Sequence, residues 1–206
     1  MKKHHAFVLG FVLFTIAIIS SASAKMITTP LYHFFDENHA VCIPESFSVI
    51  YDDITDEELE KICFTREEAM KFLDDYNVDL FAFDDNERCF YIGVYENPVP
   101  KSTPYEGYED AVKIAKVMTK YLDDPAYDIL FIEPYITDTD CFGKAAFTFE
   151  SDGETVYCLE YCMIYDDELI DLIAYSNSGQ YSIEDEHILD EIACSIGIWI
   201  TLNQIS

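Results

Sequence analysis

A β-hairpin that is apolar on both faces constrains the fold of this chain more than any other feature of its sequence. Residues 144–150 and 154–165 flank Asp152-Gly153, a strong signal for a two-residue hairpin turn. With that turn, one face carries Ala145, Phe147, Phe149, Val156, Cys158 and Cys162, and the other carries Tyr157, Leu159, Tyr161 and Met163. Because both faces would need cover, we expect helices on the two sides of an antiparallel sheet.

Further strands are predicted on both sides of this hairpin in the sequence. Their ranges are 40–49, 79–83, 89–96, 127–136 and 169–175. Pro44 interrupts the first of them, which places that strand near an edge or a bend.

Four helices are predicted from capping signals and apolar spacing. Thr55 with Glu58, and Thr65 with Glu68, form two capping boxes that open short helices. Residues 108–122 carry one apolar stripe, and a last helix starts at Ser182, three residues before Asp185. The fold class is therefore α+β, a three-layer α/β/α sandwich around a central antiparallel sheet.

The first 24 residues have the three parts of a cleavable signal peptide in the right order. A basic start over 1–5 precedes an apolar run over 6–19, and Ala22-Ser23-Ala24 follows as a small-x-small cleavage site. The apolar run is 14 residues long, whereas a helix that spans a bilayer needs about 20. We expect a secreted or periplasmic protein that is cleaved after Ala24 and has no membrane anchor.

The domain organisation follows from this boundary. Residues 25–39 are predicted to be an N-terminal linker or edge segment. Residues 40–206 are predicted to form a single α+β domain with a helical insertion at about 55–83.

The charge of the chain restricts its partners. The chain has 40 acidic and 12 basic residues, and loss of Lys2 and Lys3 with the signal peptide leaves a net charge of about −30. Such a surface repels nucleic acids and anionic membranes, and it suits divalent cations or a protein partner with a basic surface. The acids fall mostly between apolar runs, which is typical of acidic loops on a folded domain.

Seven cysteines follow the signal peptide, and export would permit disulfides. An odd number leaves at least one thiol unpaired or paired between chains. Cys158 and Cys162 would lie about 13 Å apart on one strand, too far to bridge each other. The pairing of the other cysteines stays open.

The order of elements resembles the PsbP-like domain, a fold shared by an extrinsic photosystem II subunit and a Ran-binding transport factor. The likeness rests on an entry strand at 41–47, on the hairpin, on 172–175 with its polar loop, and on the closing helix at 188–196. Residues 55–83 resemble an insertion seen in exported bacterial PsbP-like proteins. The resemblance implies an antiparallel sheet with helices on both faces and an accessory or partner-binding role. It implies no shared active site.

Calcium is the ligand for which the sequence offers weak candidates. Asp138-Thr139-Asp140 begins like an EF-hand loop, but Phe142 and Phe149 occupy positions that need ligand oxygens. An irregular acidic site remains as a hypothesis, with candidate ligands Asp84, Asp85, Glu87, Asp138 and Asp140. Otherwise no cofactor is expected.

No catalytic motif stands out, and we expect an exported non-enzymatic protein that acts as a partner-binding or accessory module. Two alternatives stay open: a calcium-stabilised acidic structural protein, and a secreted hydrolase of unrecognised type.

The signal peptide leads to a direct prediction. When the chain is expressed with its own leader in an exporting cell, the exported form should begin at Lys25. Intact mass and N-terminal sequencing measure this start. An exported form that retains Met1 would contradict cleavage and indicate a membrane anchor.

Overall fold

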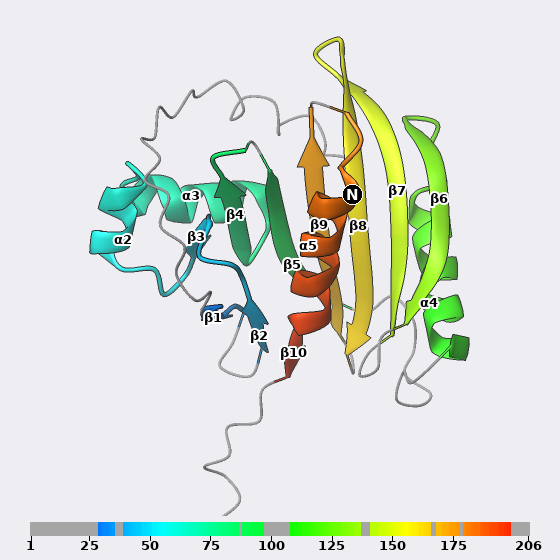
Figure 1. Ribbon diagram of the computed structural model, residues 1–206, viewed down its shortest axis with the longest axis horizontal. Coiled ribbons are helices and arrows are strands. Elements are labelled where there is room, and N and C mark those ends of the chain that lie inside the picture. Colours follow the sequence, from blue (N-terminus) through cyan, green and yellow to red (C-terminus); the bar gives the residue numbers. More distant parts are fainter. Residues whose placement is uncertain are drawn as a thin grey trace, which may run out of the picture.

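A seven-stranded antiparallel sheet forms the middle layer of the molecule (Figure 1). The computed structural model describes residues 29–35, 39–86, 88–96, 108–136, 141–165, 168–177 and 179–198, so the predicted signal peptide and the loop over 97–107 lie outside the described residues. Across the sheet the strands are β3 (Phe47–Tyr51), β4 (Leu80–Asp84), β5 (Cys89–Glu96), β9 (Glu168–Ser176), β8 (Glu154–Tyr165), β7 (Cys141–Ser151) and β6 (Tyr127–Ile136).

The predicted hairpin lies inside this sheet. Ser151 of β7 pairs with Glu154 of β8 around a two-residue turn, in which Asp152 and Gly153 have φ values of 52° and 84°. Two positive φ values match the right-handed twist of the flanking strands, as in a type I′ turn. The two apolar faces then separate as the sequence predicts, into two different buried clusters.

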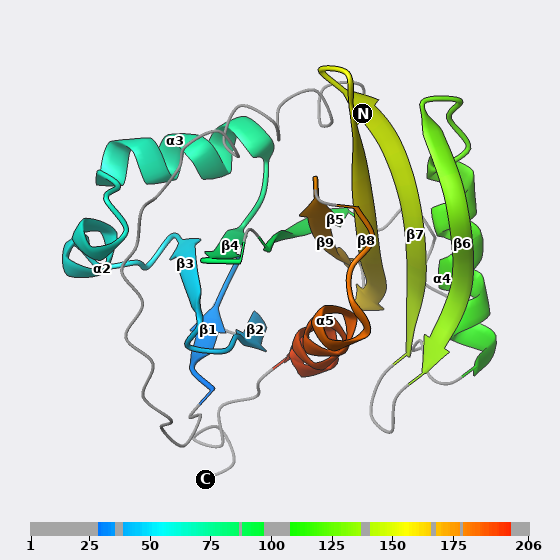
Figure 2. The same ribbon diagram turned by 45° about the horizontal axis from the view of Figure 1, so that its top comes forward.

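Helices cover both faces of the sheet, so the three-layer α+β architecture is confirmed (Figure 2). α5 (Ile183–Ser195) covers one face of the sheet. α4 (Tyr108–Tyr121) covers the opposite face, where it packs on β6, β7 and β8. α2 (Asp56–Lys61) and α3 (Arg66–Tyr76) cover β3 and β4 with a cluster of their own. None of the described helices is long and apolar enough to span a membrane.

Sequence signals at the helix starts act as predicted. The Thr55 and Thr65 side chains each accept from a backbone N–H three residues on. In turn, the Glu58 and Glu68 carboxylates accept from the backbone N–H groups of Thr55 and Thr65. Ser182 accepts from the backbone N–H of Asp185 at 3.1 Å and opens α5. These bonds satisfy amide groups that the first turn of a helix leaves without partners.

Pro44 divides the predicted strand over 40–49 between two sheets. Residues before it form β2 (His39–Cys42), which pairs with β1 (Leu31–His33) and β10 (Gly197–Ile198) in a small three-stranded sheet. Residues after it form β3 of the large sheet, and the Phe47 amide donates to the Pro44 carbonyl in the turn between them. Of the region 55–83 proposed as an insertion, the helices end at Tyr76 and residues 80–83 belong to β4.

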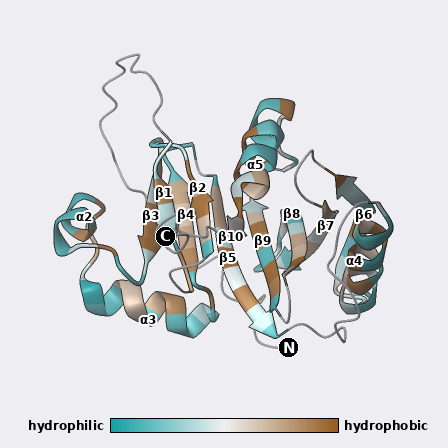
Figure 3. Ribbon diagram, turned by 90° about the horizontal axis from the view of Figure 1, so that it is seen from below, coloured by the Kyte–Doolittle hydropathy of each residue, from teal (hydrophilic) through white to brown (hydrophobic). Residues whose placement is uncertain are grey.

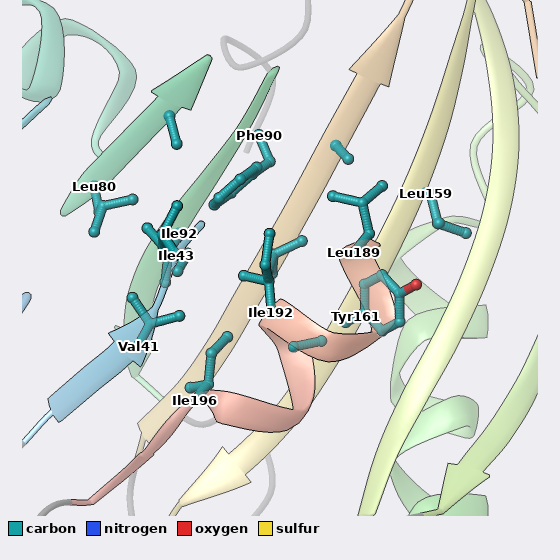
Figure 4. Packing of buried hydrophobic residues seen from close by; sticks show 14 of the residues in the cluster. Val41, Ile43, Leu80, Phe90, Ile92, Leu159, Tyr161, Leu189, Ile192 and Ile196 are labelled. Carbon is teal, nitrogen blue, oxygen red and sulfur yellow. The ribbon is translucent and has the colours of Figure 1, made fainter. Parts of the chain in front are cut away.

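The core between α5 and the large sheet is the larger of the two main clusters (Figure 4). Leu189 and Ile192 of α5, and Ile196 directly after it, point toward the sheet, and each is at most 3% exposed. The small sheet adds Val41 and Ile43 to the same cluster. Figure 3 shows α5 on one side of the strands and α3 on the other.

A buried lysine fastens α5 to the sheet. Lys144 of β7 is 3% exposed, and its Nζ lies 2.6 Å from Glu186 and 2.8 Å from Asp190, both on α5. The ring centroids of Tyr135 and Tyr161 lie 5.0 and 5.2 Å from the same Nζ. Burial alone would lower the pKa of Lys144, but the hydrogen bonds to the two carboxylates outweigh burial and raise it.

Replacement of this lysine should therefore cost stability. We expect Lys144→Met to lower the free energy of unfolding by roughly 3 kcal/mol, because two carboxylates lose their counter-charge. Urea unfolding at neutral pH measures the change. Lys61→Met is the matched control, since its pair with Glu57 is exposed and should contribute at most about 0.5 kcal/mol. Equal losses in the two variants would contradict the fastening role of Lys144.

Candidate functional site

The acidic turn at the end of β4 is held by an ion pair between Asp84 and Arg88. The Asp84 carboxylate accepts from the backbone amides of Asn86 and Arg88 at 2.9 and 3.1 Å, and from Arg88 Nε at 2.7 Å. Arg88 also donates to Asp185 of α5 at 2.8 Å and lies over the ring of Phe47. The loop therefore joins β4 and β5 to α5.

The calcium candidates are only partly placed. Asp84 is engaged as above, and Asp85 is exposed beside it. Glu87, Asp138 and Asp140 lie outside the described residues. Within the described ranges, no three His, Cys, Asp or Glu side chains are grouped closely enough to hold a metal ion.

A pair of buried acids lies on the α4 face of the sheet. Glu160 of β8 and Asp171 of β9 are 1% and 8% exposed. Glu160 stands opposite Ile173, and Asp171 stands opposite Cys162, so the two acids occupy neighbouring rows of the same face. The Tyr121 hydroxyl of α4 donates to Glu160, and the Cys162 side chain hydrogen-bonds Asp171. Asp171 Oδ1 is buried without a hydrogen-bond partner among the described residues.

Burial makes these acids hold protons more tightly than usual. It raises the pKa of Asp171 to about 7, against a lowering effect from the hydrogen bond with Cys162. Burial and the neighbouring Asp171 together raise the pKa of Glu160 well above its ordinary value, against a lowering effect from Tyr121. At neutral pH the pair therefore retains a proton.

The sequence carried a signal for this pair that its acidic composition concealed. Glu160 alternates with Cys158 and Cys162, and Asp171 alternates with Ile173, so each acid occupies an inward position of a two-sided apolar strand. A carboxyl group in such a position is expensive to bury and usually has a specific role or a retained proton. Here the pair is closed to solvent, so it can hold a proton but offers no surface to a substrate.

Burial makes three of the described thiols unreactive. Cys42, Cys63, Cys89, Cys158 and Cys162 are free thiols. Burial raises the pKa of Cys89 to about 12 and raises that of Cys158 and Cys162 well above the ordinary thiol value. Because the thiolate is the reactive form, these three side chains are poor nucleophiles at neutral pH.

The outer edge of β6 carries several exposed apolar side chains. β6 is the last strand of the large sheet, and nothing among the described residues pairs with its outer edge. Three of the exposed large hydrophobic side chains lie on it: Ile129 at 38%, Leu130 at 49% and Ile136 at 44% exposure. We call residues 127–136, with their unpaired side, the β6 edge.

Comparison with known proteins gives a likeness of fold. The structure is similar to the cyanobacterial PsbP protein CyanoP of Synechocystis, with a TM-score of 0.49, 11% identity, and coverage of 88% of this chain and 99% of that one. It is similar to the Saccharomyces cerevisiae Ran-binding protein Mog1p, with a TM-score of 0.45, 8% identity, and coverage of 84% and 96%. It is also similar to LpqN, described as involved in cell envelope biogenesis of Mycobacterium tuberculosis, with a TM-score of 0.43, 9% identity, and coverage of 84% and 92%.

A PsbP protein and a Ran-binding protein, the two kinds of protein named in the resemblance drawn from the sequence, are thus both among the similar structures. No family model matches the chain, and no curated protein matches it. The likeness assigns no functional residue, so a function has to be argued from the side chains of this chain.

The buried acid pair should make stability depend on pH. The pKa values of both acids are higher in the folded than in the unfolded chain, and that of Asp171 is about 7, so folding takes up protons in a window that begins at about pH 4 and includes pH 7. The contribution of the pair to the free energy of unfolding is full at pH 4 and falls as the pH rises through this window. Glu160→Gln removes one of the two acids and keeps an acceptor for Tyr121. We expect it to raise the melting temperature at pH 8 by several degrees and to change it little at pH 4.5.

Asp128→Asn is the matched control for this experiment, because it removes the same charge from an exposed position. Melting curves of the three proteins from pH 4 to pH 8 separate the buried pair from general repulsion among the acids. If both variants gained equally at pH 8, the pair would not be the cause.

Proposed function

We propose that the chain is an exported, non-enzymatic module that binds a protein partner with a basic surface. The observation that carries the proposal is how the chain uses its own cations. Eight basic residues lie in the described ranges, and six of them are within ion-pair distance of a carboxylate: Lys61, Arg66, Lys71, Arg88, Lys113 and Lys144. The chain thus neutralises most of its described cations itself.

The electric field outside the molecule is consequently negative. The net charge is −28 over the full chain. Around α2 and α3 the excess is strongest: between Asp52 and Asp75, ten acidic residues are exposed, and the three basic residues are all ion-paired. Such a field accelerates the approach of a positively charged partner and repels phosphate-rich nucleic acids and anionic membranes.

The fate of the reactive groups supports a binding role over a catalytic one. Glu160 and Asp171 are closed to solvent, and the Asp84 carboxylate is held by Arg88. Burial raises the pKa of Cys158 and Cys162, so their thiolates are scarce. Each of these groups is used for structure, whereas the charge and the β6 edge face outward.

The proposal is tested with the partner that the chain contacts in its producing cell. A chain carrying photo-crosslinking residues on α3 is expressed there, and the crosslinked protein is identified and purified. We expect this protein to be basic, and its association rate constant should fall at least about tenfold as salt rises from 50 to 500 mM, because steering is screened.

Two charge variants of the chain sharpen this test. Neutralisation of five exposed acids (Asp52→Asn, Asp53→Asn, Glu60→Gln, Glu67→Gln and Asp74→Asn) should slow association and flatten its salt dependence. The opposite change (Lys61→Gln, Arg66→Gln and Lys71→Gln) should speed association. An acidic partner, a salt-independent rate, or a hydrolase activity that one substitution abolishes would each contradict the proposal.

A further inference from the structure

The two faces of the β6 edge differ in chemistry, and this difference follows from the register with β7. Asp128 stands opposite Thr148 and Glu133 opposite Lys144, so both acids lie on the face that α5 covers farther along the sheet. Ile129, Ile132 and Ile136 stand opposite Phe147, Ala145 and Cys141, on the face that α4 covers. One face of the edge therefore carries both acids beside the partly buried Phe131 and Tyr135, and the other face is apolar.

The negative charge of Glu133 is not neutralised by its cross-strand neighbour. Lys144 directs its Nζ to Glu186 and Asp190 of α5 instead, at 2.6 and 2.8 Å. Glu133 itself is exposed. A cation on a strand next to β6 would meet this carboxylate at the distance of an ordinary cross-strand pair.

The same features disfavour a second copy of this chain. A register shift between Ile129 and Phe131 forms a bulge, and Pro134 lacks an amide hydrogen. Bulges, prolines and charges on an edge strand are the usual protection against pairing of like edges. A second β6 would bring two more carboxylates to an edge whose charged side chains, Asp128 and Glu133, are both acidic, on a molecule whose net charge is already −28.

We propose that an extended segment of a partner adds to the β6 edge as an eighth strand, with basic residues facing Asp128 and Glu133 and apolar residues beside Ile129, Ile132 and Ile136. This inference rests on the proposed function and specifies how the basic partner is held. The main-chain bonds of an added strand supply affinity, and alternation of basic and apolar side chains supplies specificity. The register with β7 is regular from Phe131 to Ile136, so an added strand would pair along this stretch, except that Pro134 has no amide hydrogen to donate.

Synthetic peptides test this arrangement on the purified chain. The first peptide alternates lysine and valine over eight residues. The second has the same composition in two blocks, with all of its lysines before all of its valines. The third is the alternating peptide with N-methyl groups on every second residue. Fluorescence anisotropy at 150 mM salt measures the affinity of each.

We expect the alternating peptide to bind about tenfold more tightly than the block peptide, which corresponds to about three cross-strand pairs of average strength. N-methylation should remove this advantage, because it removes main-chain donors without a change of charge.

Two chain variants locate the binding. Glu133→Lys reverses a charge at the β6 edge, and Asp74→Lys makes the same change on α3, where Asp74 is exposed. We expect the first to weaken the alternating peptide by about fivefold and the second to change it by less than about twofold.

The outcomes distinguish a failure of strand addition from a failure of the proposed basic partner. If the alternating and block peptides bind equally, and the two variants behave alike, strand addition is overturned while a basic partner remains. If no basic peptide binds even at 50 mM salt, the proposed function fails as well. A dimer in gel filtration that Leu130→Glu dissociates would also overturn the inference, because a second copy would then occupy the edge.

Discussion

Burial of one sheet from both sides is the constraint on which the rest of this structure depends. Along β9 every residue between the two ends is buried, and the side chains of β8 from Val156 to Ile164 are buried as well. Neither helix layer could be removed without exposure of half of that apolar surface to water. The order of elements, the helices on the two faces and the small sheet at β2 together cover the apolar side chains on both faces of the sheet.

The parts of this arrangement that local chemistry determines were predictable from the sequence. Two capping boxes, one Asp-Gly turn and one proline place the helix starts, the hairpin and the division between the sheets, because each acts within a few residues of itself. The buried polar groups were not predictable in the same way. Tyr121 lies 39 residues before Glu160, and the acids that hold Lys144 lie 42 and 46 residues after it. Only the packed layers bring such partners together, and among 40 acids no local pattern marks which of them will be buried.

Charge is distributed in an unusual way between the interior and the surface. Lys144 and Arg88 lie at the junction of α5 and the sheet, where each contacts two carboxylates; Lys144 also lies over two aromatic rings and Arg88 over one. Most of the other described acids are exposed to water. These two cations therefore fasten α5 to the sheet, whereas the other described lysines and arginines are exposed on a surface where acids outnumber them. On the opposite face of the sheet, two acids meet without such a fastener and keep a proton instead. The two solutions share a cause, since a buried carboxylate needs either a counter-charge or a hydrogen.

The small sheet has a topological consequence. β2 pairs with β1 on one side and with β10 on the other, with Leu31 opposite Cys42 and Gly197 opposite Ala40. The first and last described strands thus flank a single four-residue strand, and the described backbone runs nearly in a closed ring. In such an arrangement the backbone can be opened at an exposed turn, while a short linker joins the segments that flank β2. The fold is therefore suited to circular permutation, with the tight turn at Asp152-Gly153 as a natural place for new termini.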